Sequence, residues 1–279
     1  MIELGKLNSL EILRTTSVGL FLGDNEGNDI LLPNKYVPES YEIGSKISVF
    51  CYLDYEERPI ATTLEPYIMA NEFQLLEVVE VNEFGAFMQW GLEKHLLVPF
   101  REQRVKMQEG QWYVVYCYLD ERSNRLVASN KLDRFLSNDN IELKVWDQIE
   151  IIVTRQTNLG WEVIVNNKHK GLVYSNEVFK KIAIGDTMPA CIKTIRKDNK
   201  LDISLQPLGT RVLEPAANKI FEMLTKENGF LPFNDKSSPE EITTTFQMSK
   251  KTFKKGIGSL YKERKIEIKT DGIHSIKSN

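Results

Sequence analysis

The side chains that most often act as nucleophiles, general bases or metal ligands are few in this sequence and form no catalytic pattern. The three cysteines and three histidines lie far apart, without a CxxC pair or a histidine spacing suited to a metal. No P-loop, GxSxG or HExxH sequence occurs either. We therefore expect no enzymatic activity, no metal site and no cofactor. The cysteines are expected to be small buried side chains on equivalent strands: Cys51, Cys117 and Cys191.

One segment near the C-terminal end has a pattern suited to contact with phosphate groups. From Lys250 to Lys265 it contains seven basic residues and a single acid, Glu263. If this segment is a helix, lysines recur at i and i+4 opposite Phe253 and Ile257 and form a ridge that could enter a DNA major groove or contact RNA phosphates. The alternative is a solvated face that only keeps the domain soluble. The residues expected to contact nucleic acid are Lys250, Lys251, Lys254, Lys255 and Lys262.

Charge and hydropathy limit the class of protein. Hydrophobic residues make up 42% of the chain and charged residues 27%, which is ordinary for a globular protein. The net charge of −3 argues against a uniformly basic surface, although residues 211–279 hold 13 basic and 9 acidic residues. Nucleic-acid binding must therefore come from local patches or stacking. Because neither a signal peptide nor an apolar run of membrane-spanning length is present, we expect a cytoplasmic protein without membrane association.

The elements that would position such side chains begin with an internal repeat. At an offset of 66 residues, VGLF from Val18 matches FGAF from Phe84, and VFCYLD matches VYCYLD. A third, more diverged copy follows at an offset of 75 residues, where Gly85 matches Gly160. Each copy contains about five short runs rich in β-branched and aromatic residues, separated by glycine or charged turns. This pattern is typical of a small barrel of the OB type.

Two sets of glycines suit the corners of such a barrel. Gly19 and Gly85 lie inside strand patterns, which indicates a bulge or a sharp bend. Gly44, Gly110 and Gly185 precede the fourth strand and suit a turn with positive φ.

After residue 210 the spacing of apolar residues becomes helical. A helix is predicted behind Pro215, a second after a capping box of Ser238 and Glu241, and a third after Ser249. A hairpin that turns at Asp271-Gly272 completes the order of a winged helix-turn-helix domain. The residues predicted on the apolar faces are Ala217, Ile220, Phe221 and Leu224 in the first helix and Phe253, Ile257, Leu260 and Tyr261 in the third.

Together these motifs resemble a known family. The series FGAFM, LLVP, EG and YLDERSNRLVAS is similar to the RNA-binding repeat of ribosomal protein S1, and three repeats before a winged helix resemble the conserved virulence factor B family. The expected fold is therefore mainly β, with three tandem OB-fold (S1-type) β-barrels followed by a C-terminal α+β winged helix-turn-helix domain. The expected ranges are 1–66 (diverged), 67–138 and 139–208 for the barrels and 209–279 for the winged helix.

The resemblance implies that two aromatics on the second strand, an aromatic or histidine on the third, and a basic residue near the last turn bind RNA. In the middle repeat these are Phe84, Phe87 and Arg125, with His95 and Phe100 close to a third-strand position that is taken by Pro99.

The other two repeats depart further from the family pattern. In the third repeat Tyr174 and Lys200 match it, whereas Leu159 and Glu162 replace the aromatic pair. We expect the neighbouring Trp161 to compensate for this loss. The first repeat keeps Arg58 but has lost most of the stacking set, so we expect it to be mainly structural.

Exposed aromatics beside a cation can bind single-stranded RNA without a strong net charge, because stacking contributes ~1–3 kcal/mol per base. We therefore expect an RNA-binding protein that regulates gene expression after transcription. Single-stranded RNA is the expected partner, with duplex nucleic acid at the winged helix and the ribosome as further candidates. The alternatives are a DNA-binding transcription regulator that uses the winged helix and a ribosome-associated adaptor.

Overall fold

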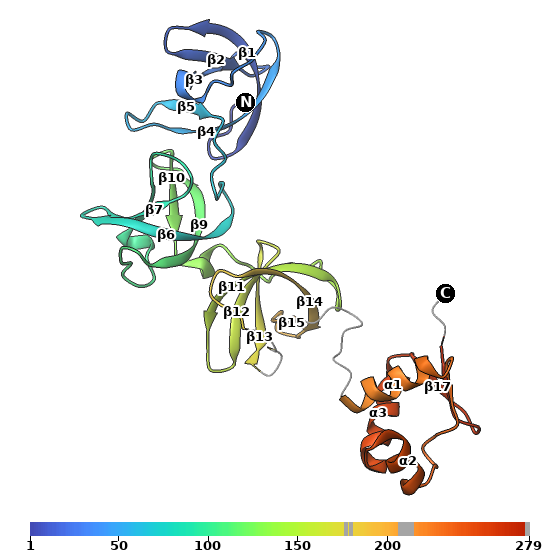
Figure 1. Ribbon diagram of the computed structural model, residues 1–279. Helices are drawn as coiled ribbons and strands as arrows, with labels where there is room; N and C mark the ends of the chain where they lie inside the picture. Colours follow the sequence, from blue (N-terminus) through green and yellow to red (C-terminus); the bar gives the residue numbers. More distant parts are fainter. Residues whose placement is uncertain (176–177, 179–180, 206–214, 277–279) are drawn as a thin grey trace. The chain divides into compact units, whose positions relative to one another are not determined.

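The structure is a computed structural model of the 279-residue chain and describes residues 1–175, 178, 181–205 and 215–276 (Figure 1). The chain divides into two compact units, Met1–Leu205 and Gln206–Asn279. The first unit contains three closed barrels, and the described part of the second contains three helices and a three-stranded sheet. The expected fold of three barrels followed by a winged helix domain is confirmed. The predicted boundary at residue 208 lies outside the described residues.

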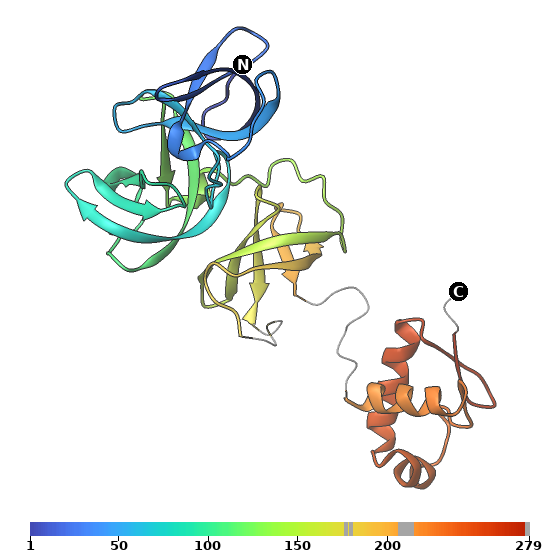
Figure 2. The ribbon, with the colours of Figure 1, turned by 45° about the horizontal axis from the view of Figure 1, so that its top comes forward.

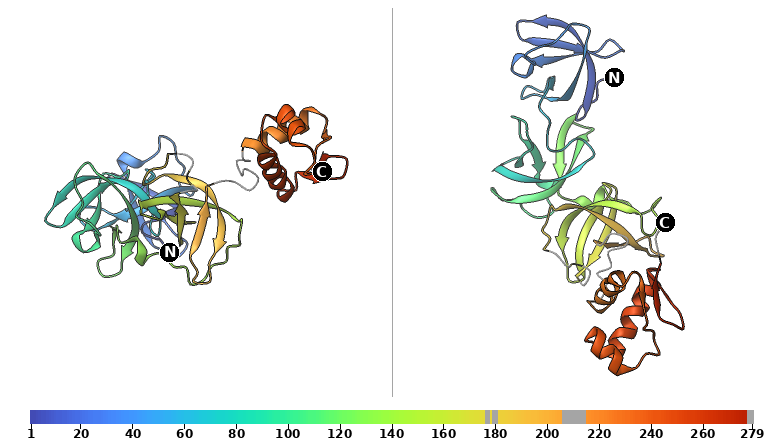
Figure 3. Two further views of the ribbon diagram at one scale, coloured as in Figure 1. Left: turned by 90° about the horizontal axis from the view of Figure 1, so that it is seen from below. Right: turned by 45° about the vertical axis from the view of Figure 1, so that its right-hand side comes forward.

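The three barrels repeat one strand order. In each, the first strand pairs with the second and fourth, and the third pairs in parallel with the fifth, which is the OB topology. Figures 1 and 3 show the strands of each barrel curling around a closed interior. The strands are β1 (Leu7–Thr16), β2 (Gly19–Gly23), β3 (Asp29–Pro33), β4 (Lys46–Leu53) and β5 (Pro59–Thr62) in the first barrel; β6 (Phe73–Asn82), β7 (Gly85–Gln89), β8 (Leu96–Pro99), β9 (Trp112–Asp120) and β10 (Arg125–Ser129) in the middle barrel; and β11 (Gln148–Gln156), β12 (Gly160–Val165), β13 (His169–Tyr174), β14 (Thr187–Ile195) and β15 (Leu201–Ser204) in the third.

A β-bulge recurs in the first strand of every barrel. The register shifts after Ile12 in β1, after Val78 in β6 and after Val153 in β11, so the bulges follow the same offsets as the sequence repeat. The bulge therefore lies on the strand before Gly19 and Gly85 and not at these glycines, where a bulge or a sharp bend was predicted. A bulge increases the local twist of its strand, which helps a five-stranded sheet to close.

The glycine that opens the second strand is required by a close backbone contact. Gly85 has a φ of 151°, and a Cβ there would lie 2.3 Å from the carbonyl oxygen of Val98 on β8. Gly160 has the same environment in the third barrel, with 2.1 Å to the carbonyl oxygen of Val173. No side chain fits between strands at this distance. The positive φ predicted before the fourth strand is confirmed at Gly44, Gly110 and Gly185.

All three cysteines are buried, as predicted. Cys51 faces Ala61 and Cys117 faces Ala128 across the fourth and fifth strands of their barrels. Cys191 faces Ser204 instead, so it lies one residue out of register with the other two. Burial raises the pKa of the Cys51 and Cys117 thiols to about 12, which keeps them protonated and unreactive.

Apolar side chains connect neighbouring barrels within the first unit. Phe50 and Tyr52 of β4 share one buried cluster with Trp90 of the middle barrel, and the rings of Phe50 and Trp90 meet edge to face at 5.8 Å. Ile164 of the third barrel shares another cluster with Phe73 of the middle barrel. Small barrels bury little apolar area alone, so these contacts stabilise the barrels and hold neighbouring faces together.

In the second unit, α1 lies across α3, and the helices enclose a core against the small sheet (Figure 2). The predicted capping box is present: Ser238 Oγ accepts from the Glu241 N–H at 3.2 Å, and the Glu241 carboxylate accepts from the Ser238 N–H at 3.0 Å. The predicted apolar faces are confirmed except at Tyr261, which is 57% exposed because Leu260 fills the core at that end of α3. The elements are α1 (Pro215–Lys226), β16 (Phe230–Leu231), α2 (Pro239–Phe246), α3 (Lys250–Lys262), β17 (Ile266–Ile268) and β18 (Ile273–Ser275).

Candidate nucleic-acid interface

An open groove lies on the face of the middle barrel that contains β7, β8 and β10, with a cavity volume of ≈ 400 Å³. Four residues singled out in the sequence line it together: Phe84, Phe87, His95 and Arg125. Its lining also includes further aromatic and basic residues, Tyr52, Tyr55, Trp90 and Lys94, and one acid, Glu80. The side chains predicted for the middle repeat are thus brought to one place by the fold.

The two phenylalanines are presented by β7 and the turn before it. Phe84 lies in the turn, where its N–H donates to Asn82 Oδ1 at 3.0 Å, and it is 64% exposed. Phe87 is half-buried on β7, between Ala86 and Met88, which point into the core. Gly85 lies on the same face of the strand as Phe87 and has no side chain that could cover the Phe87 ring.

The cations of the groove are held by groups of the first barrel. The Arg125 guanidinium forms an ion pair with the carboxylate of Glu57, in the turn between β4 and β5. Lys94 Nζ donates to the carbonyl oxygens of Leu53 at 3.0 Å and Asp54 at 2.6 Å, and burial lowers its pKa. A phosphate in the groove would compete with Glu57 for Arg125, because both anions form charge-assisted hydrogen bonds with a guanidinium.

Two aromatic residues of this groove, Tyr55 and Trp90, were not predicted from the sequence. Tyr55 lies in the β4–β5 turn and is 74% exposed, and its hydroxyl donates to the carbonyl oxygen of Glu93 at 3.0 Å. The buried Trp90 donates from Nε1 to the carbonyl oxygen of Lys94 at 2.5 Å, which fixes the loop that carries Lys94 and His95. The sequence signal that could have identified this site was Tyr55 itself. It is an aromatic residue in a charged turn, at a position where the middle repeat has an acid.

The equivalent face of the first barrel holds a second groove, with a cavity volume of ≈ 640 Å³. Arg58 lines it, with its guanidinium paired at 2.8 Å with both Asp54 and Glu56. Phe21 also lines it and lies beneath the Arg14 guanidinium, 4.1 Å from the ring centroid. The barrel expected to be mainly structural therefore has a face lined by aromatic and basic side chains, together with the carboxylates of Asp29, Asp54 and Glu93.

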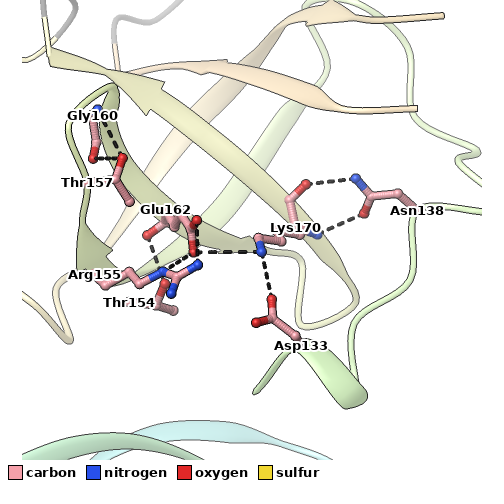
Figure 4. Close-up of polar contacts among 8 residues, drawn as sticks. All are labelled: Asp133, Asn138, Thr154, Arg155, Thr157, Gly160, Glu162 and Lys170. Atoms are coloured by element: carbon pink, nitrogen blue, oxygen red, sulfur yellow. Dashed lines mark hydrogen bonds and ion pairs between the residues drawn. The ribbon is translucent and has the colours of Figure 1, made fainter. Parts of the chain in front are cut away.

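The third barrel has a polar network where the middle barrel has phenylalanine. Glu162 on β12 occupies the position of Phe87, and its carboxylate pairs with the Arg155 guanidinium and, at 3.7 Å, with Lys170 Nζ (Figure 4). Lys170 also lies 2.7 Å from Asp133. These charges compensate one another, and a carboxylate offers no surface on which a base can stack.

The residues predicted in the third barrel do not form one cluster. Trp161 is half-buried and packs against the barrel core. Tyr174 lies on the other face of the sheet, and its hydroxyl contacts the Arg196 guanidinium. Lys200 is exposed, with Nζ 2.7 Å from the carboxylate of Asp198. A role of these residues in RNA binding stays a prediction.

In the second unit, α3 presents the predicted lysines on its solvent side. Ser249 caps the helix by accepting the Thr252 N–H at 3.1 Å, and Phe253 and Ile257 are buried on the opposite side. Lys250 is partly buried, and the other predicted lysines are exposed: Lys251, Lys254, Lys255 and Lys262.

Two glycines of α3 lead to opposite expectations for stability. A Cβ at Gly256 would lie 2.8 Å from Ile220 Cδ1, whereas a Cβ at Gly258 would meet nothing within 4 Å. We expect Gly256→Ala to lower the melting temperature of the winged helix domain. Gly258→Ala should raise it, because alanine is favoured over glycine in a helix interior by about 1 kcal/mol. Circular dichroism melts measure both shifts, and equal destabilisation by the two variants would contradict this assignment.

Two domain families match the chain: the S1 domain at residues 4–64 and the CvfB-like winged helix domain at residues 218–274. Uncharacterized protein YitL of Bacillus subtilis (strain 168) is 30% identical over 273 residues, which cover 94% of this chain and 90% of that protein. Conserved virulence factor B of Staphylococcus epidermidis (strain ATCC 12228) is 28% identical over 96% of this chain and 93% of its own length. The chain belongs to the conserved virulence factor B family.

A solved structure is also similar to this member of the conserved virulence factor B family. It is a multidomain protein with nucleic acid binding domains from Streptococcus pneumoniae TIGR4, 25% identical, with 98% of both chains covered and a TM-score of 0.43. The combination of an S1 domain and a winged helix domain in this chain supports nucleic-acid binding as its general function.

Within the described ranges, no group of three or more His, Cys, Asp or Glu side chains is placed to hold a metal ion. None of the helices in this part of the chain is long and apolar enough to cross a membrane.

Proposed function

We propose that the protein binds single-stranded RNA, without a catalytic step, and regulates gene expression after transcription. The observation that supports this most strongly is the groove of the middle barrel, where Phe84, Phe87 and Arg125 lie together. The bases of a single strand are free to stack on exposed rings, and a neighbouring cation suits the phosphate. In a duplex the bases already stack on one another and are unavailable to these rings.

Stacking is expected to contribute more than charge to binding at the barrels. The whole chain has a net charge of −3, and the two arginines that line the grooves, Arg58 and Arg125, are paired with carboxylates. An approaching phosphate must replace these carboxylates, which reduces the net electrostatic gain. Binding at the barrels should therefore depend only moderately on salt.

The exposed lysines of α3 support an added contact with phosphate groups. A DNA-binding transcription regulator that places α3 in a major groove is the alternative, and it predicts tighter binding of duplex DNA than of single-stranded RNA. An adaptor on the ribosome predicts binding of neither.

Anisotropy titrations of the full chain with labelled single-stranded RNA and with duplex DNA, each at two salt concentrations, test the proposal. We expect tighter binding of the single-stranded RNA. Tighter binding of duplex DNA that is insensitive to Phe84→Ala would overturn the proposal. Binding of neither nucleic acid would favour the adaptor.

A variant with Lys251→Gln and Lys254→Gln is expected to bind RNA with a weaker salt dependence. For a single strand each lost phosphate contact reduces the slope of log K against log salt by about 0.7, so the loss of two contacts reduces it by about 1.4. Titrations over a range of salt measure the slope. The matched control, Lys219→Gln with Lys226→Gln on α1, removes the same charge from the same domain. An equal change in the control would show that α3 has no specific role.

A further inference from the structure

The grooves of the first and middle barrels share three lining residues, Tyr52, Tyr55 and Lys94. We call these residues the inter-barrel ridge. Because each of them borders both grooves, the two grooves, of ≈ 640 Å³ and ≈ 400 Å³, open on either side of the same ridge. A ligand that fills the groove of the middle barrel therefore ends at the edge of the first.

Both barrels contribute to the inter-barrel ridge and hold it in place. The hydroxyl of Tyr55, from the first barrel, donates to the carbonyl oxygen of Glu93, whose carboxylate pairs with Lys35. In the other direction, Lys94 of the middle barrel donates to the carbonyl oxygens of Leu53 and Asp54. Each barrel thus donates a hydrogen bond to the backbone of the other, next to the apolar cluster that the two barrels share. The ridge is therefore already formed in the free protein, so a ligand does not need to order it.

The chemistry of the inter-barrel ridge repeats that of the groove in the middle barrel. Tyr55 is 74% exposed although its hydroxyl is bonded, so its ring is open to solvent, and Lys94 Nζ lies 5.8 Å from the ring centroid. Phe21 continues this series of rings into the first barrel, with the Arg14 guanidinium above it. A ring beside a cation at each step matches the repeat of base and phosphate along a single strand.

We propose that the two grooves form one binding surface, on which a single strand of RNA passes from the middle barrel across the inter-barrel ridge to Phe21 of the first barrel. This inference rests on the proposed function, because it requires RNA in the groove of the middle barrel. It assigns Tyr55 as a stacking residue that one barrel supplies to the site of another. The bound length should then exceed that of a single OB barrel.

Titrations of the full chain with RNAs of about 6 and about 20 nucleotides test this inference, since one OB barrel covers about 4–16 nucleotides. The wild-type chain should bind the longer RNA more tightly. Phe21→Ala should lose about fivefold or more in affinity for the longer RNA, the equivalent of about 1 kcal/mol, and bind the shorter one unchanged. Tyr55→Ala should weaken binding of both RNAs, while Tyr55→Phe, which keeps the ring, should not.

Tyr41→Ala is the matched control, because Tyr41 is a 39% exposed tyrosine of the first barrel that lines neither groove. Crosslinking of the longer RNA, with 4-thiouridine along its length, to the wild-type chain should yield peptides that contain Tyr55 and Phe21. The single surface is disproved if Phe21→Ala and Tyr55→Ala bind the longer RNA like the wild type and these crosslinks are missing. The proposed function still stands in that case if Phe84→Ala loses binding. If the wild type binds neither RNA, both fail together.

Discussion

Replacing Phe84 and Phe87 together by alanine is expected to weaken binding of single-stranded RNA by at least roughly 30-fold. Stacking of a base on an aromatic ring contributes about 1–3 kcal/mol, so two rings contribute at least about 2 kcal/mol, and every 1.4 kcal/mol is a factor of ten. Phe84 is 64% exposed, so its loss removes little buried area from the free protein. Anisotropy titrations at constant salt measure the effect.

Phe100→Ala is the control for this double variant. Phe100 also belongs to the middle barrel and is 44% exposed, but it follows β8 and does not line the groove. Its replacement should leave the affinity for RNA unchanged. An equal loss of affinity in the control, or no loss in the double variant, would show that the groove is not the stacking site.

Gly85→Ala is expected to destabilise the middle barrel by roughly 2–5 kcal/mol. Positive φ values cost an alanine about 1–2 kcal/mol, and overpacking costs about 1–3 kcal/mol. The added Cβ would lie 2.3 Å from the carbonyl oxygen of Val98, a backbone atom that cannot move without breaking the pairing of β7 and β8. Hydrogen exchange of the amides of these two strands measures the loss of local stability.

Gly110→Ala separates the two contributions. Gly110 has a φ of 72°, but a Cβ there would meet nothing within 4 Å. Only the conformational cost of about 1–2 kcal/mol should remain. Equal destabilisation at both positions would mean that the close approach of β7 and β8 does not matter.

Much of the fold could be predicted because it depends on local patterns. The spacing of Gly85 and Gly160 places the second strands of two barrels, and Ser238 with Glu241 places the start of α2, since turns and caps involve residues close in sequence. The errors concern packing instead. The bulge lies one strand earlier than predicted, and Tyr261 is exposed because Leu260 fills the core.

The candidate site could be predicted only in part. Phe84, Phe87 and Arg125 lie at fixed positions of one repeat, so the fold of that repeat alone brings them together. The contributions of Tyr55 and Lys94 depend on how two barrels pack, and Trp161 depends on which face of β12 is turned to the core. Strand alternation defines two faces but does not by itself say which one meets a neighbouring barrel.

The sequence by itself determined the three barrels, the winged helix domain and the set of aromatic and basic residues in the middle barrel, because periodicity, glycine positions and capping act over short distances. Only the tertiary structure decided that Glu57 pairs with Arg125, that Glu162 lies within a salt-bridge network, and that Tyr55 joins two grooves. These contacts join residues of different strands or barrels, and their partners are selected by packing and charge complementarity between segments far apart in the sequence.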